Sequence, residues 1–187
     1  MVTERVTVRC PADAATRAAR IALVVTDNDG VLTDGTVYVS AAGEAMKAYS
    51  VRDGMGVERL RDHGIATAIV TREPPALVAP RAHKLEVRLW TGVRNKRAHL
   101  PRMLDEAGVT LDRLAYIGDD LNDLDIIETI GGVGLTAAPG DAMPRVRDRV
   151  HYVCDTPGGR GAFREFAEWL LRLRTAEDPH EKRRPDR

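Results

Sequence analysis

Residues 21–35 read IALVVTDNDGVLTDG, and this stretch decides the fold. It begins with a short apolar run rich in β-branched residues, which is typical of a fully buried strand. The run ends at Asp27 and Asp29, and ligands of open parallel sheets bind at the carboxyl ends of the strands. The stretch therefore predicts a carboxylate site at the end of a buried strand. The alternative is an ordinary polar turn in which Gly30 supplies a positive φ.

The composition of the whole chain is that of a globular protein with a sizeable core. Of its 187 residues, 43% are hydrophobic, and 28 basic residues balance 28 acidic ones. This balance and the scarcity of aromatic residues argue against a nucleic-acid partner. Cys10 and Cys154 are too few and too far apart for a disulfide framework or a zinc site. Without an apolar stretch of about 18 residues or a signal-peptide pattern, we expect a cytoplasmic protein with no membrane partner.

Strands and helices are predicted to alternate along the chain. After the opening strand, further strands are expected at 65–70, 87–90, 114–117, 133–136 and 150–153. Helices are expected at 53–63 with Asp53 as cap, from the Pro74-Pro75 pair to Leu85, from a cap at Asn95 to Ala107 with a kink or late start at Pro101, from Asp141, and over 163–173. Parallel neighbours need crossover helices, so this order predicts an α/β fold. We expect a doubly wound, Rossmann-like parallel sheet of about six strands with helices on both faces.

Two β-prone runs, 36–40 and 45–49, flank a predicted four-residue loop at 41–44. They indicate a hairpin over about 36–49 that projects from the end of the sheet carrying the carboxylates. Residues 1–20 are interpreted as a weakly specified N-terminal lead-in and 21–174 as a single domain. The charged segment 175–187 is predicted to be disordered.

Polar side chains follow other predicted strands as well. Thr71 follows the strand at 65–70, Asp119 and Asp123 follow the strand at 114–117, and Lys96 lies at a helix start. Several carboxylates at one sheet edge cannot all ionise in a small space unless a cation neutralises them. The pattern therefore predicts a divalent metal, and oxygen ligation favours Mg²⁺.

A calcium-binding EF-hand loop is the nearest alternative, because residues 27–30 read DNDG. With Gly30 in the sixth position of such a loop, the first ligand would be Val25 and the twelfth Thr36. Neither side chain supplies a carboxylate, so this register fails.

The set of residues resembles the haloacid dehalogenase superfamily of phosphohydrolases. The resemblance rests on Asp27-x-Asp29 after the first strand, Thr71 after the second, Lys96, and Gly-Asp-x-x-x-Asp at 118–123. It implies that Asp27 is the nucleophile and that Asp29 is the general acid and then the general base. It also implies that Mg²⁺ is held by the carboxylates of Asp27 and Asp119 and by the backbone carbonyl of Asp29. Asp123 would support the metal site or orient Lys96.

Residues 21–174 resemble more narrowly the phosphatases of 2-keto-3-deoxy sugar acids. The motifs are DGVLTDG at 29–35, the hairpin, VRDG at 51–54, GVxxK at 92–96, GDDLND at 118–123 and GGRGAxRE at 158–165. The resemblance implies a phosphorylated sugar acid substrate, no large cap domain, and a homotetramer with the hairpins at its centre. In that tetramer the neighbour's Gly-Arg segment reaches the substrate. Closely similar domains are also fused to sialic acid cytidylyltransferases.

The same resemblance supplies candidates for substrate binding, which are Gly30, Arg52, Arg72, Glu73, Lys84 and Arg160. Thr71, Glu73 and Lys84 match the pattern of nonulosonate 9-phosphate phosphatases, although Arg72 replaces the glycine of that pattern. We therefore expect a nonulosonate 9-phosphate first and octulosonate 8-phosphate next. The alternatives are a phosphorylated sugar or nucleoside intermediate of secondary metabolism, and an inactive tetramerising domain that partners a cytidylyltransferase.

Overall fold

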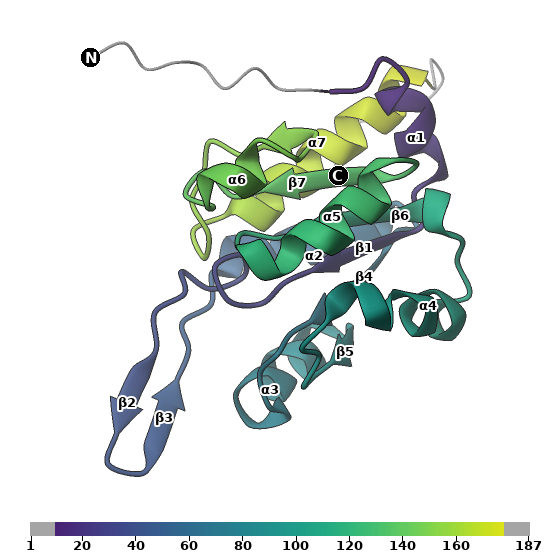
Figure 1. The fold of residues 1–187 in the computed structure, drawn as a ribbon. Helices are drawn as coiled ribbons and strands as arrows, with labels where there is room; N and C mark the ends of the chain where they lie inside the picture. The colour runs from purple at the N-terminus through teal and green to yellow at the C-terminus, as the bar shows by residue number, and fades with distance from the viewer. Residues whose placement is uncertain (1–9, 178–187) are drawn as a thin grey trace.

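The computed structural model describes residues 10–177, and its centre is a six-stranded parallel sheet (Figure 1). The strands follow the order β5-β4-β1-β6-β7-β8. Their bounds are Leu23–Thr26 (β1), Ala66–Val70 (β4), Arg88–Trp90 (β5), Leu114–Ile117 (β6), Leu135–Ala138 (β7) and Tyr152–Val153 (β8). The chain builds outward from β1 on one side and from β6 on the other. The order of the strands therefore reverses between these two central strands, where ligands of such sheets bind.

Helices cover both faces of the sheet, and the expected doubly wound architecture is confirmed. One apolar cluster packs α1 (Ala14–Arg20), α2 (Val51–Asp62), α3 (Pro75–Leu85) and α7 (Ala162–Glu177) against side chains such as Val24 and Ile69. The other packs α4 (Lys96–Ala107), α5 (Leu124–Gly131) and α6 (Pro144–Arg147) against Val25 and Val70. Successive side chains of a strand alternate between the two faces of the sheet. Because helices cover both faces, the residues of these strands are mostly apolar, and the strands appear in the sequence as nearly continuous apolar runs. Short 3₁₀ turns span Leu111–Arg113 and Leu121–Asp123.

The predicted hairpin is present and projects away from the sheet as an arm (Figure 1). It consists of β2 (Tyr38–Ser40) and β3 (Gly43–Met46), so the loop holds two residues and the prediction of four is wrong. Gly43 pairs with Ser40 across the hairpin at a φ of 108°, a conformation that glycine adopts readily. The Ser40 hydroxyl accepts a hydrogen bond from the Ala42 amide at 3.2 Å, which closes the turn.

Several predicted boundaries moved for local reasons. Strand β7 begins two residues later than expected, because Val133 and Gly134 donate backbone hydrogen bonds to Ile130 and finish the turn of α5. Strand β8 is also shorter than predicted, and α6 begins at Pro144 instead of Asp141. Helix α4 begins directly at Lys96, so the late start expected from Pro101 is wrong.

The ends of the described region are more ordered than the sequence predicts. Within the supposed lead-in, α1 lies along α7, and Arg17 donates to the carbonyls of Gly131 and Gly134 at 3.0 and 3.1 Å. Helix α7 continues to Glu177, and Arg174 donates to the Ile21 carbonyl at 3.1 Å. The remaining residues of the two predicted terminal segments, 1–9 and 178–187, lie outside the described residues.

Candidate active site

The loop after β1 presents Asp27 and Asp29 at the carboxyl end of the sheet. Asp27 continues the ladder, donating its amide to the Ile117 carbonyl at 3.0 Å, and its Oδ1 accepts the Asn28 amide at 2.7 Å. The chain then turns back, with the amides of Leu32 and Thr33 each donating to the Asn28 carbonyl at 3.0 Å. These bonds fix the direction in which each carboxylate leaves the backbone.

Gly30 allows both the turn of this loop and its close approach to Asp119. Its φ is 81°, and a Cβ at this position would overlap the carboxylate of Asp119. The glycine therefore lets the β1 loop approach the loop after β6 closely. This close approach brings the residues of two different strands into one site.

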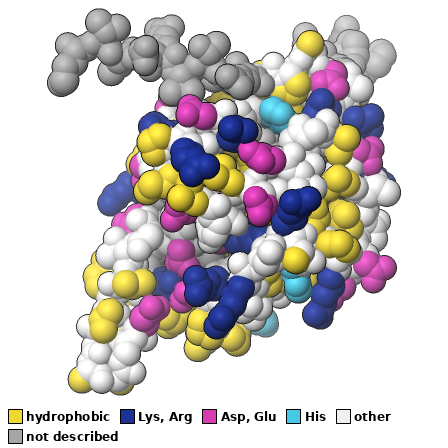
Figure 2. All heavy atoms as spheres, viewed as in Figure 1, with side chains coloured by type: hydrophobic (Ala, Val, Ile, Leu, Met, Phe, Trp, Pro, Cys, Tyr) yellow, Lys and Arg dark blue, Asp and Glu magenta, His cyan; other side chains and the backbone are white. Residues whose placement is uncertain are grey.

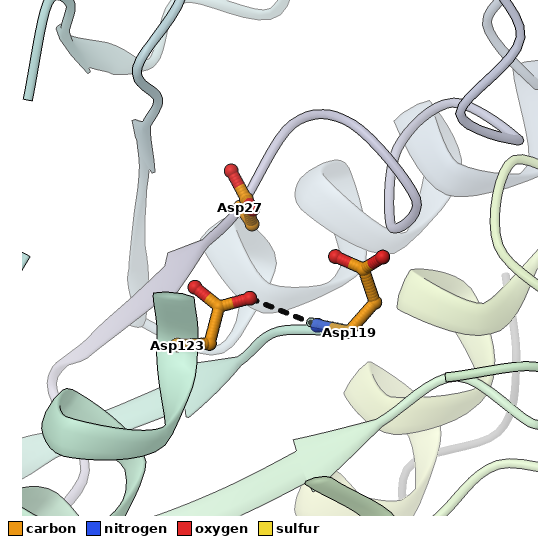
Figure 3. Close-up of side chains that lie close together, drawn as sticks. All are labelled: Asp27, Asp119 and Asp123. Carbon is orange, nitrogen blue, oxygen red and sulfur yellow. Dashed lines mark hydrogen bonds between the residues drawn. The ribbon is translucent and has the colours of Figure 1, made fainter. Parts of the chain in front are cut away.

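Asp119 and Asp123 follow β6 and face Asp27, which follows the neighbouring strand β1. Figure 3 shows the three side chains converging, with the Asp119 amide donating to Asp123 Oδ2 at 3.0 Å. One carboxylate oxygen from each residue lies within 4.8 Å of the others. The structure thus brings together the three acidic groups that the sequence placed after two separate strands.

Lys96 places its ammonium group beneath this acidic cluster. Its Nζ lies 2.7 Å from Asp27 Oδ2 and 2.5 Å from Asp123 Oδ1. Tyr116 also donates to Asp123 Oδ1 at 2.6 Å. Burial would lower the pKa of Lys96, but the charges of Asp27 and Asp123 raise it above the ordinary value. Lys96 is therefore a cation held in place by two carboxylates.

The carboxyl groups of Asp27 and Asp119 carry perturbed pKa values. Burial, and after it the charge of Asp123, raises the pKa of Asp27 to about 7, although Lys96 opposes the shift. Burial and the charges of Asp27 and Asp123 raise the pKa of Asp119 to about 8. Lys96 alone does not balance the three acids.

The acidic cluster fits a metal ion. Asp119 Oδ1 is buried and accepts no hydrogen bond from the described part of the chain. A buried carboxylate oxygen without a partner is costly, and a bound cation would remove that cost. The available donors are all oxygens, which suits hard divalent cations such as Mg²⁺.

A pocket of about 430 Å³ opens above the cluster. Its walls include Asp27, Asp29, Gly30, Asp119 and, from the loop after β4, Thr71, Arg72 and Glu73. Thr71 is buried, and its Oγ1 accepts the Glu73 amide at 3.1 Å. The hydroxyl proton of Thr71 therefore remains available to an anionic ligand. Several carboxylates around one pocket, with the Lys96 cation in contact with one of them, suit the transfer of a phosphoryl group.

Comparison with known proteins places the chain in a family. No family model matches it. The 3-deoxy-D-manno-octulosonate 8-phosphate phosphatase KdsC of Salmonella typhi is 40% identical over 157 residues, which are 83% of this chain and 82% of that protein. The chain belongs to the KdsC family of phosphatases. It is accordingly a phosphoric monoester hydrolase of the haloacid dehalogenase superfamily.

Solved structures of KdsC-type phosphatases have the same fold. The cobalt-bound deoxy-D-mannose-octulosonate 8-phosphate phosphatase YrbI of Haemophilus influenzae gives a TM-score of 0.80 at 34% identity, over 88% of this chain and 97% of that one. The Moraxella catarrhalis phosphatase, in complex with a magnesium ion, a phosphate ion and a KDO molecule, gives a TM-score of 0.80 at 31% identity, over 91% and 97% of the two chains. Among the described helices of this KdsC-family chain, none could span a membrane.

Three of the predicted substrate-binding residues lie outside the acidic pocket of this KdsC-family protein. Arg52 and Arg160 line a second pocket of about 410 Å³ together with Arg164. Lys84 is exposed on α3. A single chain therefore does not bring these cations to Asp27, whereas Gly30, Arg72 and Glu73 do line the acidic pocket.

The segment that carries Arg160 nevertheless packs directly against the β1 loop. The Gly159 amide donates to the Val31 carbonyl at 2.8 Å, and Arg160 lies 3.8 Å from Asp34 on the pocket rim. A Cβ at Gly158 would overlap the Gly30 carbonyl, and one at Gly159 would overlap the backbone of residues 33–34. These glycines therefore allow the Gly-Arg segment, residues 158–161, to pack against the loop that carries Asp27 and Asp29.

Two further site residues, Lys47 and Tyr49, were not predicted from the sequence. Lys47 Nζ lies 2.7 Å from Asp29 Oδ1 and 3.6 Å from Glu73 Oε2, so the hairpin contributes directly to the site. Tyr49 donates to Asn28 Oδ1 at 3.1 Å. The only feature in the sequence that could have indicated them is a lysine and a tyrosine placed where the predicted hairpin returns to the sheet.

Proposed function

We propose that this chain hydrolyses the phosphate monoester of a 2-keto-3-deoxy sugar acid, with 3-deoxy-D-manno-octulosonate 8-phosphate as the first candidate. The substrate class is supported by the KdsC phosphatases of Salmonella typhi and Escherichia coli, which this chain matches over most of their length. The observation that carries the chemistry is the meeting of Asp27, Asp119 and Lys96 below a pocket open to ligand.

In the proposed reaction, Asp27 attacks phosphorus and the bond from phosphorus to the sugar oxygen breaks. Asp29 gives its proton to the leaving oxygen, and an aspartyl-phosphate forms on Asp27. Asp29 then takes a proton from a water molecule that attacks phosphorus, which releases inorganic phosphate and regenerates Asp27. Lys96 and the Thr71 hydroxyl would balance the charge of the phosphoryl oxygens in both steps.

Mg²⁺ is the proposed cofactor. The carboxylates of Asp27 and Asp119 and the backbone carbonyl of Asp29 would hold it, and Asp123 would keep Lys96 and the Asp119 amide in place. When bound, the ion supplies positive charge that lowers the repulsion between Asp27 and the phosphoryl oxygens. The cobalt and magnesium ions named for two related structures support a divalent metal at this site.

A nonulosonate 9-phosphate is the second candidate substrate, and Glu73 favours it. Glu73 lines the pocket and lies beside Lys47, so it offers a fixed carboxylate that could accept hydrogen bonds from a longer polyhydroxylated chain. Arg72, also on the pocket wall, adds positive charge that would suit the phosphate or carboxylate of either sugar acid.

We further propose that the protein works as a homotetramer assembled through the hairpin. Val37, Tyr38, Val39 and Met46 are exposed there, and Figure 2 shows hydrophobic side chains along the projecting arm. Exposed apolar side chains gathered on an arm are typical of an interface. In such an assembly, Arg52 and Arg160 of one subunit would complete the substrate site of its neighbour.

A substrate panel tests the proposed function. Phosphate release is measured with Mg²⁺ for octulosonate 8-phosphate, nonulosonate 9-phosphates, hexose phosphates and nucleotides, with metal-depleted protein as the control. The proposal expects the highest kcat/KM for octulosonate 8-phosphate. Preferential turnover of a hexose phosphate or a nucleotide would contradict it. Release from none of the compounds would favour a tetramerising domain that partners a cytidylyltransferase.

A further inference from the structure

The carboxylate of Asp29 is held by one of its two oxygens. Oδ1 receives Lys47 Nζ at 2.7 Å, Asn28 Nδ2 at 3.2 Å and the Thr33 hydroxyl at 3.3 Å. In the described part of the chain, Oδ2 accepts no hydrogen bond. The two oxygens are therefore unequal, and Oδ2 is the one left to exchange a proton with a ligand.

Asn28 is the buried member of this group, and its orientation follows from its neighbours. It is fully buried between the two aspartates. A carboxylate can only accept hydrogen bonds, so the amide nitrogen must face Asp29. The amide oxygen then faces Tyr49, whose hydroxyl donates to it at 3.1 Å.

Tyr49 is itself fixed from outside the loop. The guanidinium of Arg81, on α3, lies 5.5 Å from the centre of the Tyr49 ring. Arg81 also donates to the Ser50 carbonyl at 2.9 Å. The chain of contacts runs from α3 through Tyr49 and Asn28 to Asp29, and it joins the base of the hairpin to the site.

We propose that Asn28 is a positioning residue that, backed by Tyr49, fixes Asp29 through Oδ1 and leaves Oδ2 for proton exchange with the leaving oxygen. This inference rests on the proposed role of Asp29. It gives a function to Asn28, the residue between the two aspartates, which is buried and does not line the acidic pocket. A misdirected Asp29 slows the protonation of the leaving group, whereas the attack by Asp27 is unaffected.

The test compares two leaving groups in single-turnover kinetics. An alkyl phosphate, the best substrate of the panel, needs a proton on its leaving oxygen. The phenolate of p-nitrophenyl phosphate leaves without one. Asn28→Leu keeps the number of side-chain heavy atoms and removes the amide, and Tyr49→Phe removes the hydroxyl alone. Thr110→Val, which removes an exposed hydroxyl at the opposite end of the sheet, is the control.

We expect Asn28→Leu to slow alkyl phosphate cleavage by about tenfold or more while the p-nitrophenolate burst stays within about twofold of wild type. Tyr49→Phe should act in the same direction by about threefold, and Thr110→Val should change neither rate. Equal losses with both leaving groups, or no loss with either, would overturn the proposal. If Asn28→Leu does not fold, the result for Tyr49→Phe decides.

Asp29→Asn separates this inference from the function on which it rests. If Asp29 is the general acid, its variant shows the same leaving-group dependence, only larger. An Asp29→Asn enzyme that cleaves both esters at the wild-type rate would refute the role of Asp29 itself. A normal Asn28→Leu beside a defective Asp29→Asn would refute only the positioning role of Asn28.

Discussion

Lys96 and Asp123 are buried charges that are tolerable only because each neutralises the other. Lys96 Nζ contacts Asp27 and Asp123, and Asp123 also accepts the Tyr116 hydroxyl and the Asp119 amide. Removing one partner of a buried pair typically costs about 3–5 kcal/mol, since the other charge is left uncompensated. These side chains therefore serve the fold and the site together.

Asp27→Asn should abolish turnover without unfolding the protein. The amide oxygen can still accept the Asn28 amide, and Asp123 still neutralises Lys96, but an amide is a poor nucleophile for phosphorus. We expect phosphate release to fall at least about a thousandfold while the circular dichroism spectrum is unchanged. Normal phosphate release by this variant would exclude Asp27 as the nucleophile.

The acidic cluster should make metal-free protein less stable as the pH rises. Asp27 and Asp119, with pKa values of about 7 and 8, keep their protons in the folded state at pH values where the unfolded chain has lost them. The free energy of unfolding therefore decreases from about pH 4 to pH 8. The proposed Mg²⁺ would remove this penalty when bound, so its effect on the melting temperature should grow from pH 6 to pH 8.5, as measured by calorimetry. A constant effect across that range would contradict the prediction.

Apart from Lys96, which lies at the start of α4 and was expected from the family resemblance, the site residues that could be predicted from the sequence are those that follow strands. Asp27, Thr71 and Asp119 stand at strand ends, and the carboxyl ends of parallel strands share one edge. Lys47 could not be found in this way, because its contact with Asp29 depends on how the hairpin folds back across 18 residues. The role of Asn28 could not be predicted for the same reason, since its partner Tyr49 also comes from the end of the hairpin.

At the scale of elements, the side chain of Asp53 joins α2 to α7, although the sequence pattern predicts a different role for it. The pattern predicts Asp53 as the cap of its own helix, but Ser50 caps α2 by accepting the Arg52 amide. Asp53 instead accepts the amides of Gly161 and Arg164, both at 3.1 Å, at the start of α7. A capping contact over 108 residues leaves no local signal in the sequence.

Asp53→Ala should destabilise the protein by about 1–3 kcal/mol, because the buried Gly161 amide and the partly buried Arg164 amide lose their acceptor. Urea unfolding monitored by circular dichroism measures the change. Asp62→Ala, at the exposed carboxyl end of the same helix, is the matched control and should change the stability by less than about 0.5 kcal/mol. Equal effects of the two substitutions would show that the contact with α7 contributes little.

At the scale of the whole molecule, alternation of strands and helices was sufficient to predict a doubly wound sheet. The strand order follows from right-handed crossovers that build outward on both sides of the centre. The boundaries of β7 and β8 were predicted less well because apolar residues such as Val133 and Val150 also serve turns between elements. Apolar content alone does not separate those two uses.

The hairpin arm should control the assembly state. Val39 is 72% exposed on β2, so a charge there costs an isolated subunit little but would be buried in a hairpin-mediated interface. We expect Val39→Glu to shift the sedimentation coefficient from that of a tetramer towards that of a smaller species and to raise KM. Glu58→Gln, on an exposed position of α2, is a control for altered charge. A tetramer that persists in Val39→Glu would rule out the hairpin as the interface.

The close packing of Gly30 against Asp119, and of Gly158 and Gly159 against the β1 loop, limits how this enzyme can be redesigned. A side chain at Gly30 would displace the Asp119 carboxylate, and a side chain at Gly158 or Gly159 would move the Gly-Arg segment away from the β1 loop, so a mutagenesis library should leave all three fixed. Arg72 and Met143 line the same pocket, and both are exposed. A search for altered substrate range can therefore vary residues at the pocket rim, while the glycine contacts keep the catalytic carboxylates in their positions.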